Sequence, residues 1–157
     1  MEYGSLEVKK VHILRIDPGE DVLASVKRFL AEAGVRQAIV LGAYGTLARH
    51  RIHWVRNNLI PASDIIGEGE GGIEILSMNG LVVEGQPHIH VTLSTPAGAF
   101  GGHLEDGCIA YVLCELFFAE VAGLGLRRER ADVSVAGMGE GKVPRLVFHT
   151  ANGATNC

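Results

Sequence analysis

The chain of 157 residues carries a formal net charge of −4, with 47% hydrophobic and 20% charged residues. This length and composition are typical of a single globular domain whose core is large enough to need no disulfide bonds. The negative charge disfavours general attraction to nucleic-acid phosphates, and the sequence lacks a signal-peptide pattern and an apolar run long enough to span a bilayer. We therefore expect a cytoplasmic protein without membrane contact.

The N-terminal part predicts a strand followed by a helix. Val8–Ile16 alternates as a strand does, and Asp17 then caps a helix with Pro18 in its first turn and Glu20 completing a capping box. Gly34 is a typical helix stop. The helix has one apolar stripe, formed by Val22, Leu23, Val26, Phe29 and Leu30.

The middle of the chain predicts further strands around a long loop. An apolar run, Gln37–Tyr44, precedes Leu47–Val55, which alternates and is expected to lie antiparallel to its predecessor. The glycine-rich segment Asn57–Gly72 has the composition of a loop. Ile73–Val83 is expected to turn or bend at Asn79-Gly80, a hairpin signal.

The C-terminal part predicts strands punctuated by turns. These strands are His88–Thr95, a return strand Ala99–His103 after the turn at 96–98, the apolar Ile109–Val121, and two short closing strands, Asp132–Ala136 and Arg145–His149. The whole pattern predicts an α+β fold, a mostly antiparallel β-sheet packed with one main α-helix. We expect a single domain over residues 6–149 and a disordered tail over 150–157.

The main chemical feature of the sequence is a histidine trio, His88, His90 and His103. His88 and His90 are two apart on a predicted strand and therefore share a face. The turn at 96–98 brings the next strand back, so His103, preceded by Gly101-Gly102, can lie beside them. Three imidazoles with a free fourth position are typical of an open zinc site, although imidazole also suits nickel, copper or iron.

Other interpretations of these histidines stay open. The trio could equally consist of surface residues or of core side chains satisfied by hydrogen bonds. The remaining histidines lack this spacing, and we interpret them as structural or surface residues: His12, His50, His53 and His149.

Two carboxylates are candidates for a role beside the trio. Glu105 follows His103 closely, and Glu115 interrupts an otherwise apolar strand. Either could orient a ligating imidazole or act as an acid or base. A buried carboxylate needs a partner, so Glu115 could instead be paired at a subunit interface.

Smaller features are given structural interpretations. Cys108 and Cys114 lie in an apolar run and are expected to be buried, reduced thiols. The arginine clusters are expected to form solvated faces of strands or loops, one at Arg49 and Arg51 and another at Arg127, Arg128 and Arg130.

Three ordered blocks of the sequence resemble a known family, the plants-and-prokaryotes-conserved (PPC) domain, also called DUF296. The blocks are Gly72–Gly80, Gln86–Leu93, and Gly101–Leu104 with Gly107-Cys108, followed by Glu115. The resemblance covers the chain from Val8 to about Phe148 and is strongest from Gly72 to Glu115.

The resemblance implies a compact α+β fold, a homotrimer, and zinc held by His88, His90 and His103, as in some prokaryotic members of the family. It also implies a fold similar to that of acetolactate decarboxylase, a zinc enzyme. Plant members carry an Arg-Gly-Arg-Pro AT-hook that binds DNA, and this chain has no such motif. It therefore resembles a stand-alone prokaryotic member.

Three functions follow as hypotheses. The preferred one is a trimeric metal-binding protein that acts as a regulatory or interaction module with protein partners. The second is a zinc-dependent lyase or hydrolase in which Glu105 or Glu115 moves the proton. The third is DNA binding through Arg127, Arg128 and Arg130, which the acidic balance of the chain disfavours.

Overall fold

The computed structural model describes residues 1–150. Within this range no helix is long and apolar enough to cross a membrane. The elements, in chain order, are β1 (Glu7–Ile16), α1 (Val22–Glu32), β2 (Ala38–Val55), β3 (Asp64–Val83), β4 (Gln86–Thr95), β5 (Gly98–Leu104), β6 (Ile109–Ala122), β7 (Leu124–Val135) and β8 (Gly139–Thr150).

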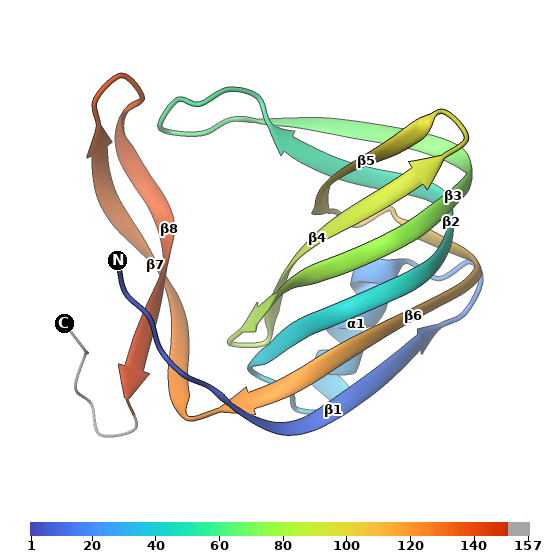
Figure 1. Cartoon of the computed structure of the whole chain (residues 1–157), viewed down its shortest axis with the longest axis horizontal. Coiled ribbons are helices and arrows are strands. Elements are labelled where there is room, and N and C mark those ends of the chain that lie inside the picture. Colours follow the sequence, from blue (N-terminus) through green and yellow to red (C-terminus); the bar gives the residue numbers. More distant parts are fainter. Residues whose placement is uncertain (151–157) are drawn as a thin grey trace.

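The main body is one antiparallel sheet that curls back on itself. Its six strands run in the order β1-β6-β2-β3-β4-β5, and the far end of β2 also pairs with β5, placing Ile52 opposite Leu104 and His53 opposite His103. Figure 1 shows β5 returning toward β2, with α1 against one side of the sheet. The predicted α+β class with a mostly antiparallel sheet is thus confirmed.

The core lies between α1 and the inner face of the sheet, the face that α1 covers. The predicted apolar stripe of the helix is confirmed, with Val22, Val26 and Leu30 fully buried. Phe29 packs on the buried Phe118 of β6, with ring centroids 5.3 Å apart. Because aliphatic side chains fill most of this face, the fold rests on close packing rather than on polar networks.

The helix begins four residues later than the sequence predicts. Asp21 is the N-cap, and its carboxylate accepts a hydrogen bond from the backbone N–H of Ala24 at 2.9 Å. Asp17 and Glu20 do bond to each other, since Glu20 accepts from the N–H of Asp17 at 3.0 Å, but this bond closes a separate turn. The predicted interaction of Asp17 with Glu20 therefore forms, but in a turn before the helix and not at its N-cap.

The predicted break between Gln37–Tyr44 and Leu47–Val55 is wrong, because both segments belong to the single strand β2. Gly45 lies at φ +142°, and a Cβ there would stand 2.2 Å from the carbonyl oxygen of Leu113 on β6. The glycine thus marks a close approach and a register shift between β2 and β6 instead of a chain reversal.

The predicted loop Asn57–Gly72 is also largely wrong, because β3 already begins at Asp64. Two glycines of β3 make room for side chains of the neighbouring strand β2. A Cβ on Gly67 would lie 2.4 Å from the Trp54 ring, and one on Gly69 would lie 2.5 Å from the His50 ring. Here glycine serves cross-strand packing, which composition alone cannot distinguish from a loop.

Of the two alternatives for Ile73–Val83, the turn between paired strands at Asn79-Gly80 is wrong, because the whole segment lies in one strand. Both residues lie within β3, and a Cβ on Gly80 would stand 2.1 Å from the carbonyl oxygen of His88 on β4. The chain turns instead at Glu84 and Gly85, whose φ values are 54° and 80°. Two successive positive φ angles are typical of a tight hairpin turn.

The C-terminal strands are longer than predicted and form a separate ribbon. β7 and β8 have 12 residues each and form a two-stranded sheet of their own, which an isolated bridge joins to Ile60 at Gly139. Figure 1 shows this hairpin standing apart from the main sheet. Its tip is attached by a hydrogen bond of 2.7 Å from the N–H of Ile60 to the carbonyl of Met138. Thr150 ends β8, and the rest of the predicted tail, residues 151–157, lies outside the described residues.

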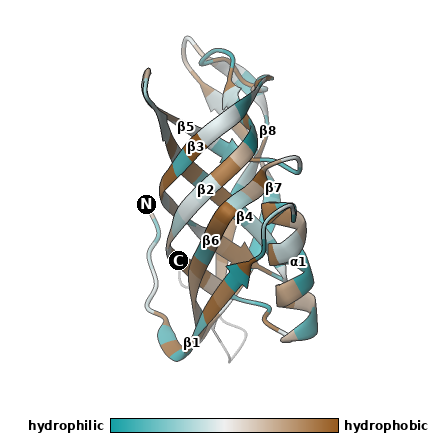
Figure 2. Cartoon of the chain, turned by 90° about the vertical axis from the view of Figure 1, so that its right-hand side faces the viewer, coloured by the Kyte–Doolittle hydropathy of each residue, from teal (hydrophilic) through white to brown (hydrophobic). Residues whose placement is uncertain are grey.

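The outer face of the sheet, opposite α1, carries exposed apolar side chains. We call Val11, Ile13, Tyr44 and Leu113 the outer apolar patch; their exposed fractions range from 40% to 69%. The half-buried Phe117 lies opposite Ile13 and packs on Tyr44, with ring centroids 6.0 Å apart. Hydrophobic stretches are visible along the strands in Figure 2, where α1 lies to one side of the sheet.

Candidate metal centre

The three predicted histidines converge on the outer face of β4 and β5. His90 lies directly opposite His103, and His88 is two residues from His90 on the same face. The ring centroid of His103 is 4.5 Å from that of His88 and 5.4 Å from that of His90. One nitrogen from each ring lies within 4.8 Å of the others, so one ion could contact all three.

Partial burial favours the neutral form of two members of the trio, His103 and His88. Removal from water and, after it, the neighbouring histidines together lower the pKa of His103 to about 4. The pKa of His88 is also lowered, first by burial and then by the positive charge of Arg128. Neutral imidazoles keep a nitrogen lone pair free, which is the form that binds metal.

A fourth histidine, His53 of β2, lies beside the trio, and the sequence interpretation missed it. Its ring lies over that of His103, with centroids 4.5 Å apart and planes at 32°. The sequence predicts a structural or surface role for His53, because the residue lacks the spacing of the trio. Only the pairing of β2 with β5 brings it to the site, and no local spacing signals that closure.

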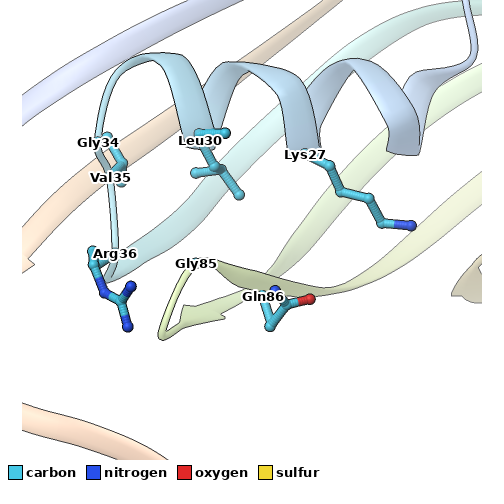
Figure 3. A pocket seen from close by; sticks show the side chains of 8 residues that line it. Lys27, Leu30, Gly34, Val35, Arg36, Gly85 and Gln86 are labelled. Atoms are coloured by element: carbon cyan, nitrogen blue, oxygen red, sulfur yellow. The ribbon is translucent and has the colours of Figure 1, made fainter.

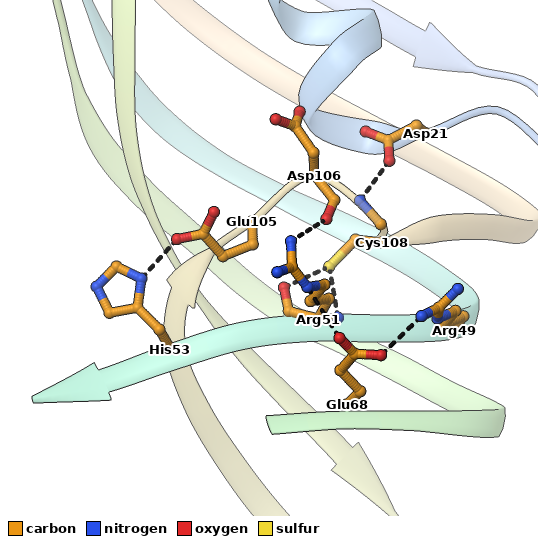
Figure 4. Close-up of polar contacts among 9 residues, drawn as sticks. Asp21, Arg49, Arg51, His53, Glu68, Glu105, Asp106 and Cys108 are labelled. Carbon is orange, nitrogen blue, oxygen red and sulfur yellow. Dashed lines mark hydrogen bonds and ion pairs between the residues drawn. The ribbon is translucent and has the colours of Figure 1, made fainter. Parts of the chain in front are cut away.

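Glu105 lies at this site and Glu115 does not. The carboxylate of Glu105 is 2.6 Å from Nδ1 of His53, and the two side chains are 28% and 22% exposed. Figure 4 shows this contact and, beside it, Arg51 holding the carbonyl of Asp106. The backbone N–H of Glu105 also bonds to the carbonyl of Arg51 at 3.1 Å, which fixes the turn after β5 to β2.

Glu115 is placed on β6 against the outer apolar patch. It accepts a hydrogen bond from the hydroxyl of Tyr44, which raises the pKa of that tyrosine, and it lies opposite Arg15 on β1. The carboxylate of Glu115 therefore has a partner within the chain. That partner, Tyr44, lies on a different part of β2 from His53.

A cavity of about 520 Å³ opens beside the trio. It is lined by residues of β2, β4 and β5, namely His53, Trp54, Val55, His90, Val91, Thr92, Gly101, Gly102 and His103. Its volume is in the range of small-molecule sites. A ligand in it would meet two members of the trio and His53 together.

A second cavity, of about 370 Å³, lies under the end of α1 (Figure 3). Lys27, Arg36 and Gln86 line it together with apolar residues of the helix. The amine of Lys27 is held by Asp106 at 2.9 Å. This second cavity lies apart from the histidines and brings no further ligating side chain to them.

The predicted arginine clusters and thiols have structural surroundings. Arg49 and Arg51 share the carboxylate of Glu68, at 2.7 Å and 2.9 Å, rather than lying free in solvent. The expected burial of both cysteines is confirmed. Burial raises the pKa of Cys108 to about 11 and that of Cys114 to about 12, so both are protonated and unreactive near neutral pH.

The second arginine cluster lies on β7, in the half of the β7–β8 hairpin away from its tip. Arg127 is 3.9 Å from Glu84, and Arg128 lies close enough to His88 to affect its pKa. Arg127, Arg128 and Arg130 are all exposed, as the sequence predicted.

The curled sheet, its single helix and the convergent histidines define a class: small α+β domains with an exposed imidazole cluster on a sheet. The chain belongs to the Plants and Prokaryotes Conserved (PCC) domain family, whose model matches residues 3–122. The family predicted from the three sequence blocks is therefore confirmed.

Solved structures from several organisms share the fold. A metal-containing protein from Archaeoglobus fulgidus is 28% identical, with 88% of this chain and 96% of that chain covered and a TM-score of 0.69. A plant- and prokaryote-conserved protein from Pyrococcus horikoshii is also 28% identical, with 83% and 92% covered and a TM-score of 0.69. A hypothetical protein from Salmonella cholerae-suis aligns over 96% and 98% with a TM-score of 0.74, at 22% identity.

A curated relative is much longer than this chain. The bifunctional protein GlmU of a Synechococcus strain is 28% identical over 121 residues, which is 76% of this chain and 18% of GlmU. The chain thus spans less than a fifth of the length of that relative.

Proposed function

We propose that this PCC-domain protein binds a zinc ion through His88, His90 and His103 and acts as a trimeric binding or regulatory module. The observation that carries the proposal is the spacing of the ligating atoms. Nε2 of His88 and Nε2 of His90 are 3.3 Å apart. Two nitrogens at the usual zinc distance and a tetrahedral angle would be about 3.4 Å apart.

The low pKa of His103 supports the same proposal. An imidazole that stays neutral down to about pH 4 can bind a metal ion over the whole physiological range. The related protein from Archaeoglobus fulgidus is described as metal-containing. Zinc fits the donor set best, and three imidazoles would leave the fourth position for a ligand.

The trimer is proposed from the outer apolar patch. Exposed apolar residues gathered on one sheet face are typical of a surface that a partner covers. Self-association through this face would bury Tyr44 and Glu115, whose side chains already share a hydrogen bond within the chain.

Elemental analysis of the purified protein tests the metal site. We expect about one zinc ion per chain in the wild type and almost none in His88→Ala or His103→Ala. The control is His12→Gln, since His12 contacts Glu120 rather than the trio. Equal metal content in all four proteins would show that the trio does not bind the ion.

A second candidate function, a zinc-dependent lyase or hydrolase, is favoured by the cavity beside the trio. Bound zinc would supply a Lewis acid or an activated water. The His53–Glu105 pair lies where it could hold a proton, at Nδ1 or at the carboxylate. Hydrolysis of an activated ester that requires zinc and is lost in His103→Ala would support this candidate, and its absence would leave the binding role.

A further inference from the structure

The second cavity, under the end of α1, has no role in the proposed metal site. We call this cavity of about 370 Å³ the α1 cavity; it lies between α1 and the turn that joins β3 to β4. Two backbone hydrogen bonds fix its walls. The N–H of Val35 bonds to the carbonyl of Leu30 at 2.9 Å, and the N–H of Gly85 bonds to the carbonyl of Arg36 at 2.8 Å. A cavity held in this way keeps its shape without a ligand, as most small-molecule sites do.

The α1 cavity is closed toward the core and open toward solvent. Leu30 and Val35 form its floor and are each only 2% exposed. Gly34 and Gly85 also line it, and a Cβ at either position would have no heavy atom outside the adjacent residues within 4 Å. The methylene groups of long charged side chains such as Lys27 add apolar surface to the walls. The hydrocarbon part of a small ligand would therefore be sheltered from water here.

The polar part of the α1 cavity is positively charged. Figure 3 shows Lys27 on α1 and, on the far side in this view, Arg36, which follows the helix. No carboxylate is among the described residues that line the cavity. Because the chain as a whole has a net charge of −4, this charge is local and does not reflect a general attraction for anions.

The two cations differ in what they already contact. The amine of Lys27 is paired, since both carboxylate oxygens of Asp106 lie within 3.0 Å of its Nζ. Within residues 1–150 the side chain of Arg36 makes no hydrogen bond or ion pair. A guanidinium carries only donors, in a planar fork that matches the two oxygens of a carboxylate. One available cation predicts a ligand with one acidic group rather than two.

Stabilisation of the end of α1 would be another use for Arg36, because a cation favours the C-terminal end of a helix. The last carbonyls of α1 already have partners, however. Phe29 accepts from the N–H of Ala33 at 2.9 Å, and Ala31 accepts from the N–H of Gly34 at 3.3 Å. Arg36 is therefore not needed there as a hydrogen-bond donor, and its guanidinium is available to a ligand.

We propose that the α1 cavity binds a small monocarboxylic acid with an aliphatic chain. The carboxylate of this acid forms a bidentate ion pair with Arg36, and the aliphatic chain lies over Leu30 and Val35. Lys27 stays paired with Asp106 and adds positive charge on the helix side. This inference depends neither on the proposed zinc site nor on the proposed trimer.

The test uses hexanoate, titrated into the purified full chain and followed by the amide NMR signals of Gly34 and Gly85. Both signals should shift in the wild type. Arg36→Gln should weaken binding about tenfold, because it removes a charge-assisted pair in an open site. Arg36→Lys keeps the charge without the planar fork and should restore part of the affinity. The matched control is Arg28→Gln, which should not change the affinity, since Arg28 of α1 is paired with Glu20 outside the cavity.

Two further probes separate the parts of the ligand. Hexanol has the same chain without the carboxylate and should bind about tenfold more weakly than hexanoate. Butyrate keeps the carboxylate but is two methylene groups shorter, and each methylene group that is buried should strengthen binding roughly fourfold. The order of affinity in the wild type should therefore be hexanoate first, with butyrate and hexanol both weaker.

A carboxylate could also bind at a metal ion, so the titration is repeated with His103→Ala. Shifts of Gly34 and Gly85 that persist in this variant would assign the acid to the α1 cavity, whether or not the trio binds zinc. The proposal is wrong if hexanoate shifts neither signal, or if the shifts are lost in His103→Ala. Equal affinity for hexanol would mean an apolar hollow without acid recognition. An unchanged affinity in Arg36→Gln would leave Arg36 with a role in helix stability alone, and either of these results would also overturn the proposal.

Discussion

The two faces of the main sheet are built from the same strands but differ in what covers them. The inner face is filled by α1 and by aliphatic side chains such as Leu116 and Val26, which are fully buried. The outer face carries the histidine trio at one end and the outer apolar patch at the other. Buried packing is thus concentrated on the inner face, and the outer face stays available for binding.

The largest expected effect comes from removing a large side chain from the inner face. Phe118→Ala should lower the free energy of unfolding by about 3–5 kcal/mol, because it leaves a cavity beside Phe29. The adjacent Phe117 points to the outer face, and Phe117→Ala should cost only about 1 kcal/mol. Urea unfolding of both variants measures the difference, and equal losses would contradict the comparison of the faces.

A charge on the outer apolar patch should break the proposed trimer and leave the chain folded. Ile13 is 69% exposed, so Ile13→Arg should change the monomer's free energy of unfolding by less than about 0.5 kcal/mol. The same charge would be buried in a trimer, and sedimentation should then show only monomer. The control is Lys10→Arg, which keeps the charge of β1. If the wild type is itself monomeric, the trimer proposal is wrong.

The histidine end of the outer face should make the metal-free protein sensitive to acid. The pKa of His103 is about 4 in the folded chain against an ordinary value of 6.5, so only the unfolded chain takes up this proton between those values. Stability should thus be full above pH 6.5 and decline as the pH falls toward 4. Chemical unfolding at several pH values measures this slope, which should be shallower in His103→Gln. An unchanged slope would exclude His103 as its source.

The smallest effect concerns the attachment of α1 to the inner face. The carboxylate of Asp21 accepts from the N–H groups of Ala24 and Gly107, so it joins the helix to the turn before β6. Asp21→Ala should cost about 1–2 kcal/mol, while Asp17→Ala should cost less than about 0.5 kcal/mol. Thermal melts of the two variants test whether the cap is at Asp21, and a larger loss in Asp17→Ala would contradict it.

Local patterns in the sequence were enough to predict some elements but not others. The helix stripe and the strand holding His88 and His90 follow from periodicities of a few residues, and β6 follows from its apolar, Val- and Phe-rich composition. Glycine was misleading in β2 and β3, because Gly45, Gly67 and Gly80 serve neighbouring strands rather than turns. Such contacts depend on residues distant in the sequence, which no local rule includes.

The same distinction applies to the candidate site. The trio could be predicted because a short hairpin places all three residues, and Glu105 follows directly after it. His53 reaches the site only through the closure of β2 onto β5, and Glu115 was considered only because a carboxylate in an apolar strand is unusual.

The double pairing of β2 also has a consequence for local motion. Around His53 this strand is hydrogen-bonded on one side to β3 and on the other to β5. Amide protons in such a strand exchange with solvent only when a large part of the sheet opens. His88, by contrast, lies close to the tight turn at Glu84 and Gly85. Hydrogen exchange should thus be slow at the His53 side of the cavity and faster at the His88 side, so that a ligand entering the cavity would meet one rigid wall and one that can adjust.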